Sequence, residues 1–79
     1  MPLYLVEMYL PRSHADEAGA TGSRARVAAE ELSRENVSIR YLRTTFLPDD
    51  ETCFHLFEAS SVEHVAEAAP DGGLVLDDQ

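Results

Sequence analysis

Four stretches of the chain are rich in apolar, β-branched and aromatic residues, which is typical of β-strands. The stretch LYLVEMYL (3–10) is stopped by a proline, and VSIRYLRTTFL (37–47) is rich in β-branched and aromatic residues. The sequence PDD then predicts a tight turn. Residues 52–59 are expected to be the hairpin partner of the second strand, and GGLVL (72–76) predicts a short last strand.

Two stretches between these strands have the spacing of amphipathic helices. From Ser23 onward small apolar residues recur every three or four positions, which predicts a helix. It is expected to end near Asn36, a residue that tolerates the left-handed conformation at a helix end. Residues 11–22 contain a proline and two glycines and are predicted to be a loop or at most a broken turn of helix. A second helix is expected from Ser60 to Pro70.

The order strand, helix, strand, strand, helix, strand predicts an α+β fold of the ferredoxin-like βαββαβ type. Right-handed crossovers then give a four-stranded antiparallel sheet in the spatial order four, one, three, two, with both helices on one face. Nothing along the chain resembles a linker between domains. We therefore expect one domain over residues 1–79.

Both faces of the predicted strands are apolar, although helices can cover only one of them. In the first strand, Leu3, Leu5 and Tyr9 alternate with residues that are as apolar as they are. A chain of 79 residues is marginal as a monomer, and its single cysteine excludes an internal disulfide. The pattern therefore predicts a closed, symmetric homodimer in which two sheets pack face to face.

Charge and composition exclude several classes of protein. The net charge is −9, and residues 44–79 contain no lysine or arginine, so the protein is expected to repel nucleic acid. Three explanations of the acidic residues in 44–79 stay open, namely solubility, a cation site and a surface for a basic partner. In the last case the protein would be an interaction module. No apolar run is long enough for a membrane span, and no signal peptide is visible, so we expect a cytoplasmic protein.

His55 is the main candidate for chemistry. It alternates with Cys53 and Phe57, so the three side chains share a face, and a hairpin turn at residues 49–50 would place Thr44 opposite it. Glu7 lies on the neighbouring strand. An imidazole and a carboxylate are ligands for Ni²⁺, Zn²⁺ or Cu²⁺, and Cys53 would be a soft third ligand.

Other interpretations of these residues stay open. In one, the protein is a small enzyme or biosynthetic accessory that binds an organic molecule between the sheets, with His55 as general base. The residues that orient or line that pocket would be Glu7, Tyr9, Tyr41 and Arg43. In another, His55 and Cys53 are packing residues and Glu7 pairs with Arg40 or Arg43. Glu58 would pair with Arg43 across the hairpin.

The segments YLVEMYLP, VSIRYLRTTFLPDDETCFHLFEAS and SVEHVAEAA resemble a family of small bacterial proteins classed as a domain of unknown function. Some members of that family are described as nickel-binding or nickel-responsive. The resemblance covers roughly residues 2–69 and is most specific around LPDDETCFHLFEA. It implies a ferredoxin-like fold paired into an α+β-barrel-like homodimer. Glu7 is similar to a recurrent glutamate of that family, and His55 stands where many members have cysteine.

The leading hypothesis from the sequence is therefore a homodimeric, non-enzymatic protein that binds nickel. Its expected ligands are His55, Glu7 and Cys53.

Overall fold

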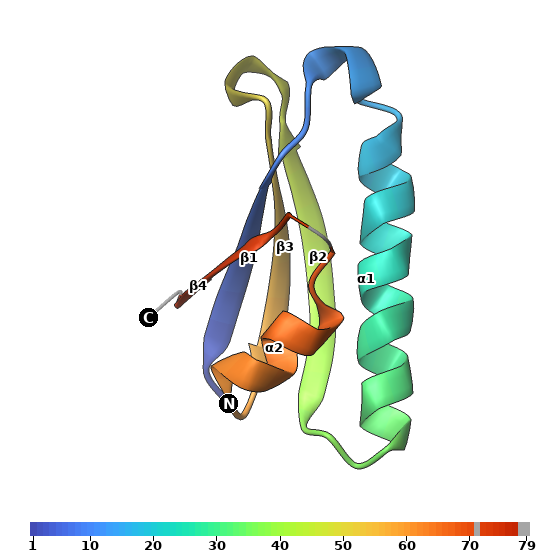
Figure 1. Cartoon of the computed structure of the whole chain (residues 1–79), viewed down its shortest axis with the longest axis vertical. Helices are drawn as coiled ribbons and strands as arrows, with labels where there is room; N and C mark the ends of the chain where they lie inside the picture. The colour runs from blue at the N-terminus through green and yellow to red at the C-terminus, as the bar shows by residue number, and fades with distance from the viewer. Residues whose placement is uncertain (71, 78–79) are drawn as a thin grey trace.

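A computed structural model describes residues 1–70 and 72–77 and confirms the ferredoxin-like α+β fold (Figure 1). The elements are β1 Leu3–Tyr9, α1 Glu17–Arg34, β2 Ile39–Leu47, β3 Thr52–Ala59, α2 Val62–Ala68 and β4 Leu74–Asp77. Short 3-10 turns at residues 12–14 and 48–50 follow β1 and β2. The strands form one antiparallel sheet in the order β2-β3-β1-β4, as the sequence predicts.

Both helices pack on one side of the sheet, and the core lies between the two layers. We call this side the helix-covered face. Its side chains are Tyr4, Val6, Met8, Ile39, Tyr41, Thr44, Phe46, Cys53, His55, Phe57, Ala59 and Val75. Ala25 and Ala29 of α1 and Val65 of α2 complete the core. The rings of Tyr41 and Phe57 meet edge to face with centroids 5.8 Å apart.

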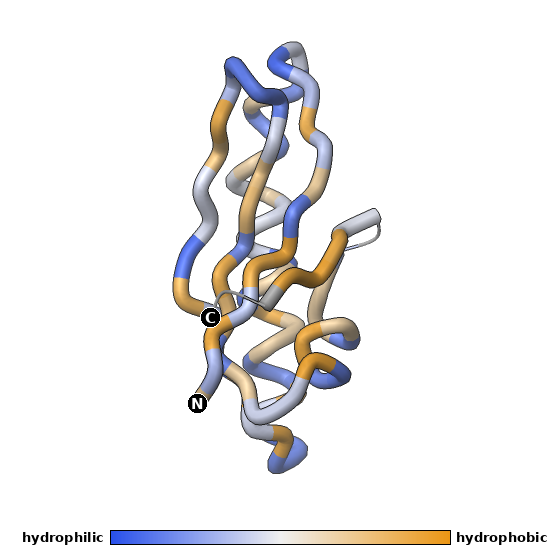
Figure 2. Tube along the Cα trace, turned by 90° about the vertical axis from the view of Figure 1, so that its left-hand side faces the viewer, coloured by the Kyte–Doolittle hydropathy of each residue, from blue (hydrophilic) through white to orange (hydrophobic). Residues whose placement is uncertain are grey.

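The other side of the sheet has no helix over it, and Figure 2 views the molecule from that side. Hydrophobic stretches of the strands lie in front there and α1 lies behind them. We call this side the uncovered face. Its side chains are Leu3, Leu5, Glu7, Tyr9, Arg40, Arg43, Thr45, Leu47, Thr52, Phe54, Leu56, Glu58, Leu74 and Leu76.

Helix α1 is longer than the sequence predicts, because it begins at Glu17 rather than near Ser23. The expected loop over residues 11–22 is therefore wrong for its second half. Glycine lowers helix propensity, but Gly22 allows close packing here. A Cβ at Gly22 would lie 2.7 Å from Thr44 Oγ1, so only glycine lets α1 approach β2 this closely.

The end of α1 is as predicted, with Asn36 in the left-handed conformation at φ 68°. The amide of Asn36 donates to the carbonyl of Ser33, and the amide of Val37 donates to the carbonyl of Leu32. These two bonds form a Schellman motif. Leu32 and Val37 both pack against the core, which fixes the direction in which the chain enters β2.

A bulge in β2 decides which residues of this strand face α1. The β2–β3 register shifts between Tyr41 and Arg43, so Leu42 is an extra residue with no partner on β3. In a regular strand Tyr41 and Thr44, three residues apart, would point to opposite faces. The bulge places both on the helix-covered face. None of the described helices is long and apolar enough to cross a membrane.

Candidate functional site

The helix-covered face contains a short chain of hydrogen-bonded polar side chains centred on His55. The expected hairpin register is confirmed, with Thr44 of β2 directly opposite His55 of β3. Thr44 Oγ1 lies 2.7 Å from His55 Nδ1, and the Tyr41 hydroxyl lies 2.5 Å from Thr44 Oγ1. We call these three residues the histidine relay. The bulge at Leu42 brings Tyr41 into it.

His55 is sealed inside the protein, with 0 % of its surface exposed. Burial lowers the pKa of His55 below its ordinary value of 6.5, so the imidazole is neutral at pH 7. Its Nε2 is buried and has no hydrogen-bond partner among the described residues. A neutral, enclosed imidazole cannot exchange protons with a substrate unless the surrounding structure opens.

Cys53 lies two residues before His55 on the same face, as expected, and is also fully buried. It lies between Met8 of β1 and Phe46 of β2 in the sheet. Burial raises the pKa of the thiol above 9.0, so the group stays protonated at neutral pH. Its surroundings are those of a small apolar core residue.

Glu7 does not meet His55, although their strands are neighbours. Val6 is the partner of His55 and Glu7 is the partner of Phe54, so the carboxylate points from the uncovered face. Two expected pocket residues, Tyr9 and Arg43, also belong to the uncovered face. Only Tyr41 of the expected pocket set joins His55.

The ion pair expected from Glu58 forms with a different arginine. Glu58 Oε1 lies 3.2 Å from Arg40 Nη2 across the hairpin, instead of pairing with Arg43. Arg40 is the register partner of Glu58, whereas Arg43 is opposite Leu56 because of the bulge. No ion pair of Glu7 or Arg43 forms among residues 1–70 and 72–77.

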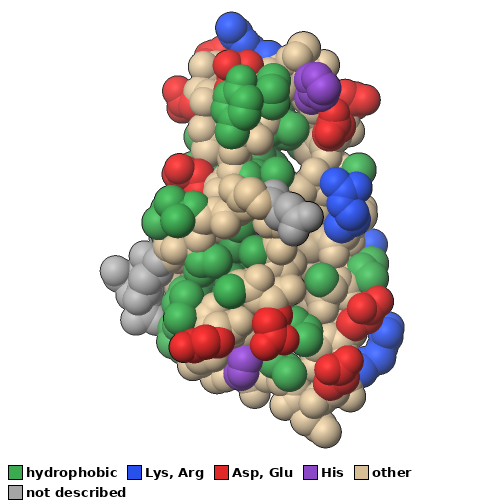
Figure 3. Space-filling model, in the orientation of Figure 1, with side chains coloured by type: hydrophobic (Ala, Val, Ile, Leu, Met, Phe, Trp, Pro, Cys, Tyr) green, Lys and Arg blue, Asp and Glu red, His purple; other side chains and the backbone are tan. Residues whose placement is uncertain are grey.

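The residues expected to hold nickel do not fit as one set of ligands. His55 and Cys53 lie under the helices and Glu7 lies on the opposite face, so one ion in one protomer cannot bind all three. Within the described part of the chain, no three His, Cys, Asp or Glu residues are grouped as metal ligands. Figure 3 likewise shows acidic side chains spread over the visible face rather than gathered.

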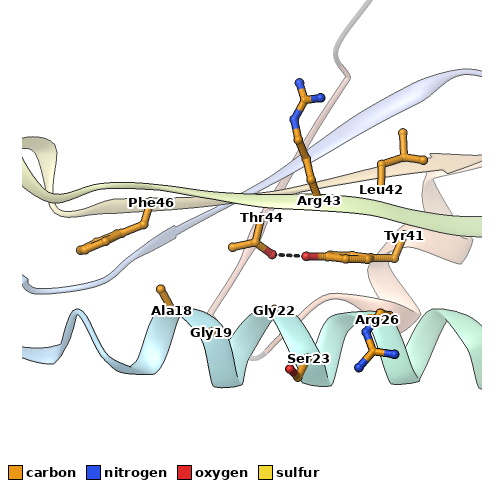
Figure 4. Close-up of a pocket in the computed structure, with 10 residues that line it drawn as sticks. All are labelled: Ala18, Gly19, Gly22, Ser23, Arg26, Tyr41, Leu42, Arg43, Thr44 and Phe46. Carbon is orange, nitrogen blue, oxygen red and sulfur yellow. Dashed lines mark hydrogen bonds between the residues drawn. The ribbon is translucent and has the colours of Figure 1, made fainter.

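A cavity of about 410 Å³ opens between α1 and β2, next to the histidine relay. Its lining residues are Ala18, Gly19, Gly22, Ser23, Arg26, Tyr41, Leu42, Arg43, Thr44 and Phe46. Figure 4 shows Tyr41, Thr44 and Phe46 pointing from β2 toward the helix, over Gly19 and Gly22. We call this space the α1–β2 cavity. The sequence gives one hint of it, a glycine pair within the segment that turns out to be helix.

A second hollow lies on the uncovered face. It has a volume of about 290 Å³ and is lined by Leu5, Arg43, Thr45, Phe54 and Leu56. Its walls are apolar except for one arginine and one threonine, which is the usual character of a surface that meets a partner or an organic ligand.

Comparisons with protein-family models, curated proteins and solved structures found no match to this chain. The described residues present hydrogen-bond donors and apolar walls, and they hold the one buried histidine neutral. This arrangement is suited to binding a molecule rather than to proton transfer.

Proposed function

We propose that the protein is a homodimeric, non-catalytic binding protein whose two sheets pack together through their uncovered faces. The observation that carries this proposal is the difference between the two faces of the sheet. One face is buried by α1 and α2, and the other carries large apolar side chains among four charged ones but has no cover from the described chain.

The uncovered face has the character of an unpaired interface. Large apolar side chains remain exposed on it, with Tyr9 at 69 % and Leu74 at 59 % of their surface. Leu5, Phe54 and Leu56 line a hollow on the same face. Burying such residues against a second copy gives a domain of this size the additional apolar contact that it lacks alone.

Charge complementarity favours a second copy of the chain as the partner. Glu7 on β1 and Arg43 on β2 carry opposite charges on the uncovered face, and neither forms an ion pair within the described residues. In a two-fold symmetric interface every contact occurs twice, because a residue pair formed in one direction is also formed in the other. Glu7 of each protomer can then pair with Arg43 of the other.

The non-catalytic part of the proposal is supported by the state of the relay. His55 is neutral, enclosed and already bonded to Thr44, so it serves as a structural anchor for hydroxyl groups rather than as a base. Cys53 is a buried, free thiol, which suits the reducing cytoplasm that the sequence predicts.

Sedimentation equilibrium tests the dimer. The wild-type protein is expected to sediment as a dimer, and Leu74→Asp is expected to weaken association at least about tenfold by burying a charge at the interface. Val27→Asp is the matched control, because Val27 is 43 % exposed on α1, away from the uncovered face. A monomeric wild-type protein, or equal effects of both variants, would contradict the proposal.

Nickel binding stays a prediction of the family resemblance. Native mass spectrometry with Ni²⁺, Zn²⁺ and Cu²⁺ tests it directly. Because His55 and Glu7 lie on opposite faces, we expect His55→Ala and Glu7→Ala to differ in their effect on any metal uptake. Equal loss of stoichiometric Ni²⁺ in both variants would show that the two residues share one ion and would overturn the assignment of faces.

A further inference from the structure

The histidine relay contains one hydrogen more than its two internal hydrogen bonds require. The Tyr41 hydroxyl, the Thr44 hydroxyl and the neutral imidazole of His55 each carry one polar hydrogen. Two of these hydrogens make the contacts from Tyr41 to Thr44 and from Thr44 to His55 Nδ1. The third must lie either on His55 Nε2 or on one of the two hydroxyls.

The position of this third hydrogen follows from burial. Nε2 is fully buried and has no partner among the described residues, so it is an orphaned donor if it carries the hydrogen and an unpaired acceptor if Nδ1 carries it, and a buried N–H without a partner is the rarer case. If Nδ1 carries the hydrogen instead, His55 donates to Thr44, and one hydroxyl hydrogen of Thr44 or Tyr41 is left over. Both hydroxyls line the α1–β2 cavity. In this arrangement the relay offers one hydroxyl hydrogen to that cavity.

The rest of the cavity wall favours an anion with an apolar body. Arg26 is a lining residue of the cavity and no acid is among those residues, although the protein carries a net charge of −9. The side chain of Arg43 points from β2 away from α1 (Figure 4), so it does not contribute its charge to the cavity. Arg26 is held by Glu30 only at 3.6 Å on an exposed part of α1. Ala18, Gly19 and the ring of Phe46 supply apolar walls.

We propose that the α1–β2 cavity binds a small organic carboxylate, with its oxygen accepting the relay hydrogen and its apolar body lying against Phe46 and the glycines of α1. The volume of about 410 Å³ is within the range of small-molecule sites. Gly22 contributes by keeping the hydroxyls accessible, since a Cβ there would lie 3.3 Å from the Tyr41 oxygen. This proposal names the ligand class for the binding role proposed above and rests on it.

Titration with benzoate, followed by amide NMR of the wild-type protein, tests the site. Saturable shifts at Gly19, Gly22 and Thr44 are expected at millimolar benzoate. The neutral analogue benzamide is expected to bind at least about tenfold more weakly, since a hydrogen bond to a charged acceptor is stronger than one to a neutral acceptor. Inorganic phosphate, which has the charge but no apolar body, is expected to cause no saturable shift at these residues.

Two variants test the contributions of the histidine relay and of the cavity walls to benzoate binding. Tyr41→Phe removes a hydroxyl, and Gly19→Leu fills the cavity from a position where a Cβ meets nothing within 4 Å. Each is expected to weaken benzoate binding at least about tenfold. Because leucine favours a helix more than glycine does, Gly19→Leu keeps the test valid even if Tyr41→Phe folds poorly. Ala20→Leu, on the exposed side of α1, is the matched control and is expected to bind normally.

The outcomes distinguish this proposal from the proposed function. A dimer without saturable benzoate shifts overturns the ligand site alone, and a monomer that binds benzoate overturns the dimer alone. Equal binding of benzoate and benzamide, phosphate binding as strong as that of benzoate, or unchanged affinity in Gly19→Leu would each contradict the carboxylate site.

Discussion

The two faces of the sheet are built from the same alternating sequence, yet they have different surroundings. Phe57 and Phe54 are three residues apart on β3, and Phe57 is completely buried under the helices while Phe54 lines the hollow on the other face. The helix-covered face has internal polar bonding through the histidine relay. The uncovered face has apolar side chains and two charges without ion-pair partners in the described chain. Within one small domain, burial by the chain's own helices separates structural residues from those available to a partner.

The largest expected contrast is between the two phenylalanines. Phe57→Ala is expected to lower the free energy of unfolding by about 3–5 kcal/mol, because it leaves a cavity in the core. Phe54→Ala is expected to cost less than half of that in a monomeric Leu74→Asp background, and to weaken the dimer in the wild-type background. Urea unfolding at several protein concentrations measures both effects. Similar losses in the monomeric background would remove the distinction between the faces.

A smaller contrast separates two adjacent threonines. Thr44→Val leaves His55 Nδ1 and the Tyr41 hydroxyl without their shared partner and is expected to cost about 1–3 kcal/mol of unfolding free energy. Thr45→Val, on the uncovered face, is expected to change it by less than about 0.5 kcal/mol. Thermal and urea unfolding of both variants test this. Equal costs would show that the relay adds nothing to stability.

The pH dependence of stability gives a third contrast, between the fully buried His55 and His64, which is half-buried on α2. Burial lowers the pKa of folded His55 below 6.5, so the unfolded chain binds more protons and stability falls as the pH drops below about 6.5. One proton limits the slope to about 1.4 kcal/mol per pH unit. His55→Gln is expected to lose this slope between about pH 7 and 5.5, and His64→Gln is expected to keep it. A slope that survives in His55→Gln would contradict the assignment.

The smallest expected effect is the charge pairing across the dimer. Glu7→Arg should weaken association by about 1 kcal/mol or less, because it places like charges together where Glu7 and Arg43 of opposite protomers are proposed to pair. Adding Arg43→Glu to the same chain should restore the affinity, since the reciprocal pairs are re-formed with reversed signs. Sedimentation equilibrium at low salt measures both constants. If the double variant were weaker than either single variant, Glu7 and Arg43 would not be partners.

Much of the fold follows from the sequence, because its signals are local. The strands from residues 3, 37, 52 and 72 onward lie where alternation and turn residues predict them, within about two residues. Asn36 ends α1 because it tolerates positive φ at low cost. The strand order and the common side of both helices follow from crossover handedness.

The candidate site was less predictable, because it depends on register and packing between distant segments. The hairpin turn correctly places Thr44 opposite His55, but no local signal fixes the register of β1 against β3. A shift of one residue exchanges Val6 and Glu7 as partners of His55 and so reverses the face. No residue pattern around Leu42 predicts the β-bulge that places Tyr41 in the histidine relay.

The first turns of α1 were missed for a related reason. Gly19 and Gly22 argue against a helix by propensity, and only contact with β2 shows why a glycine is needed at position 22. Apolar residues on both faces of the predicted strands likewise do not indicate which face the helices cover. The α1–β2 cavity therefore becomes visible only in the folded chain.

The most direct test of the central claim is the detection of intermolecular NOEs in a dimer mixed from labelled and unlabelled chains. The two-face account predicts NOEs between protomers at the methyl groups of Leu5, Leu56 and Leu74, and none at the core methyls of Ala29 and Val65. Intermolecular NOEs that are absent from the uncovered face, or that arise instead from Val27 on α1, would contradict it.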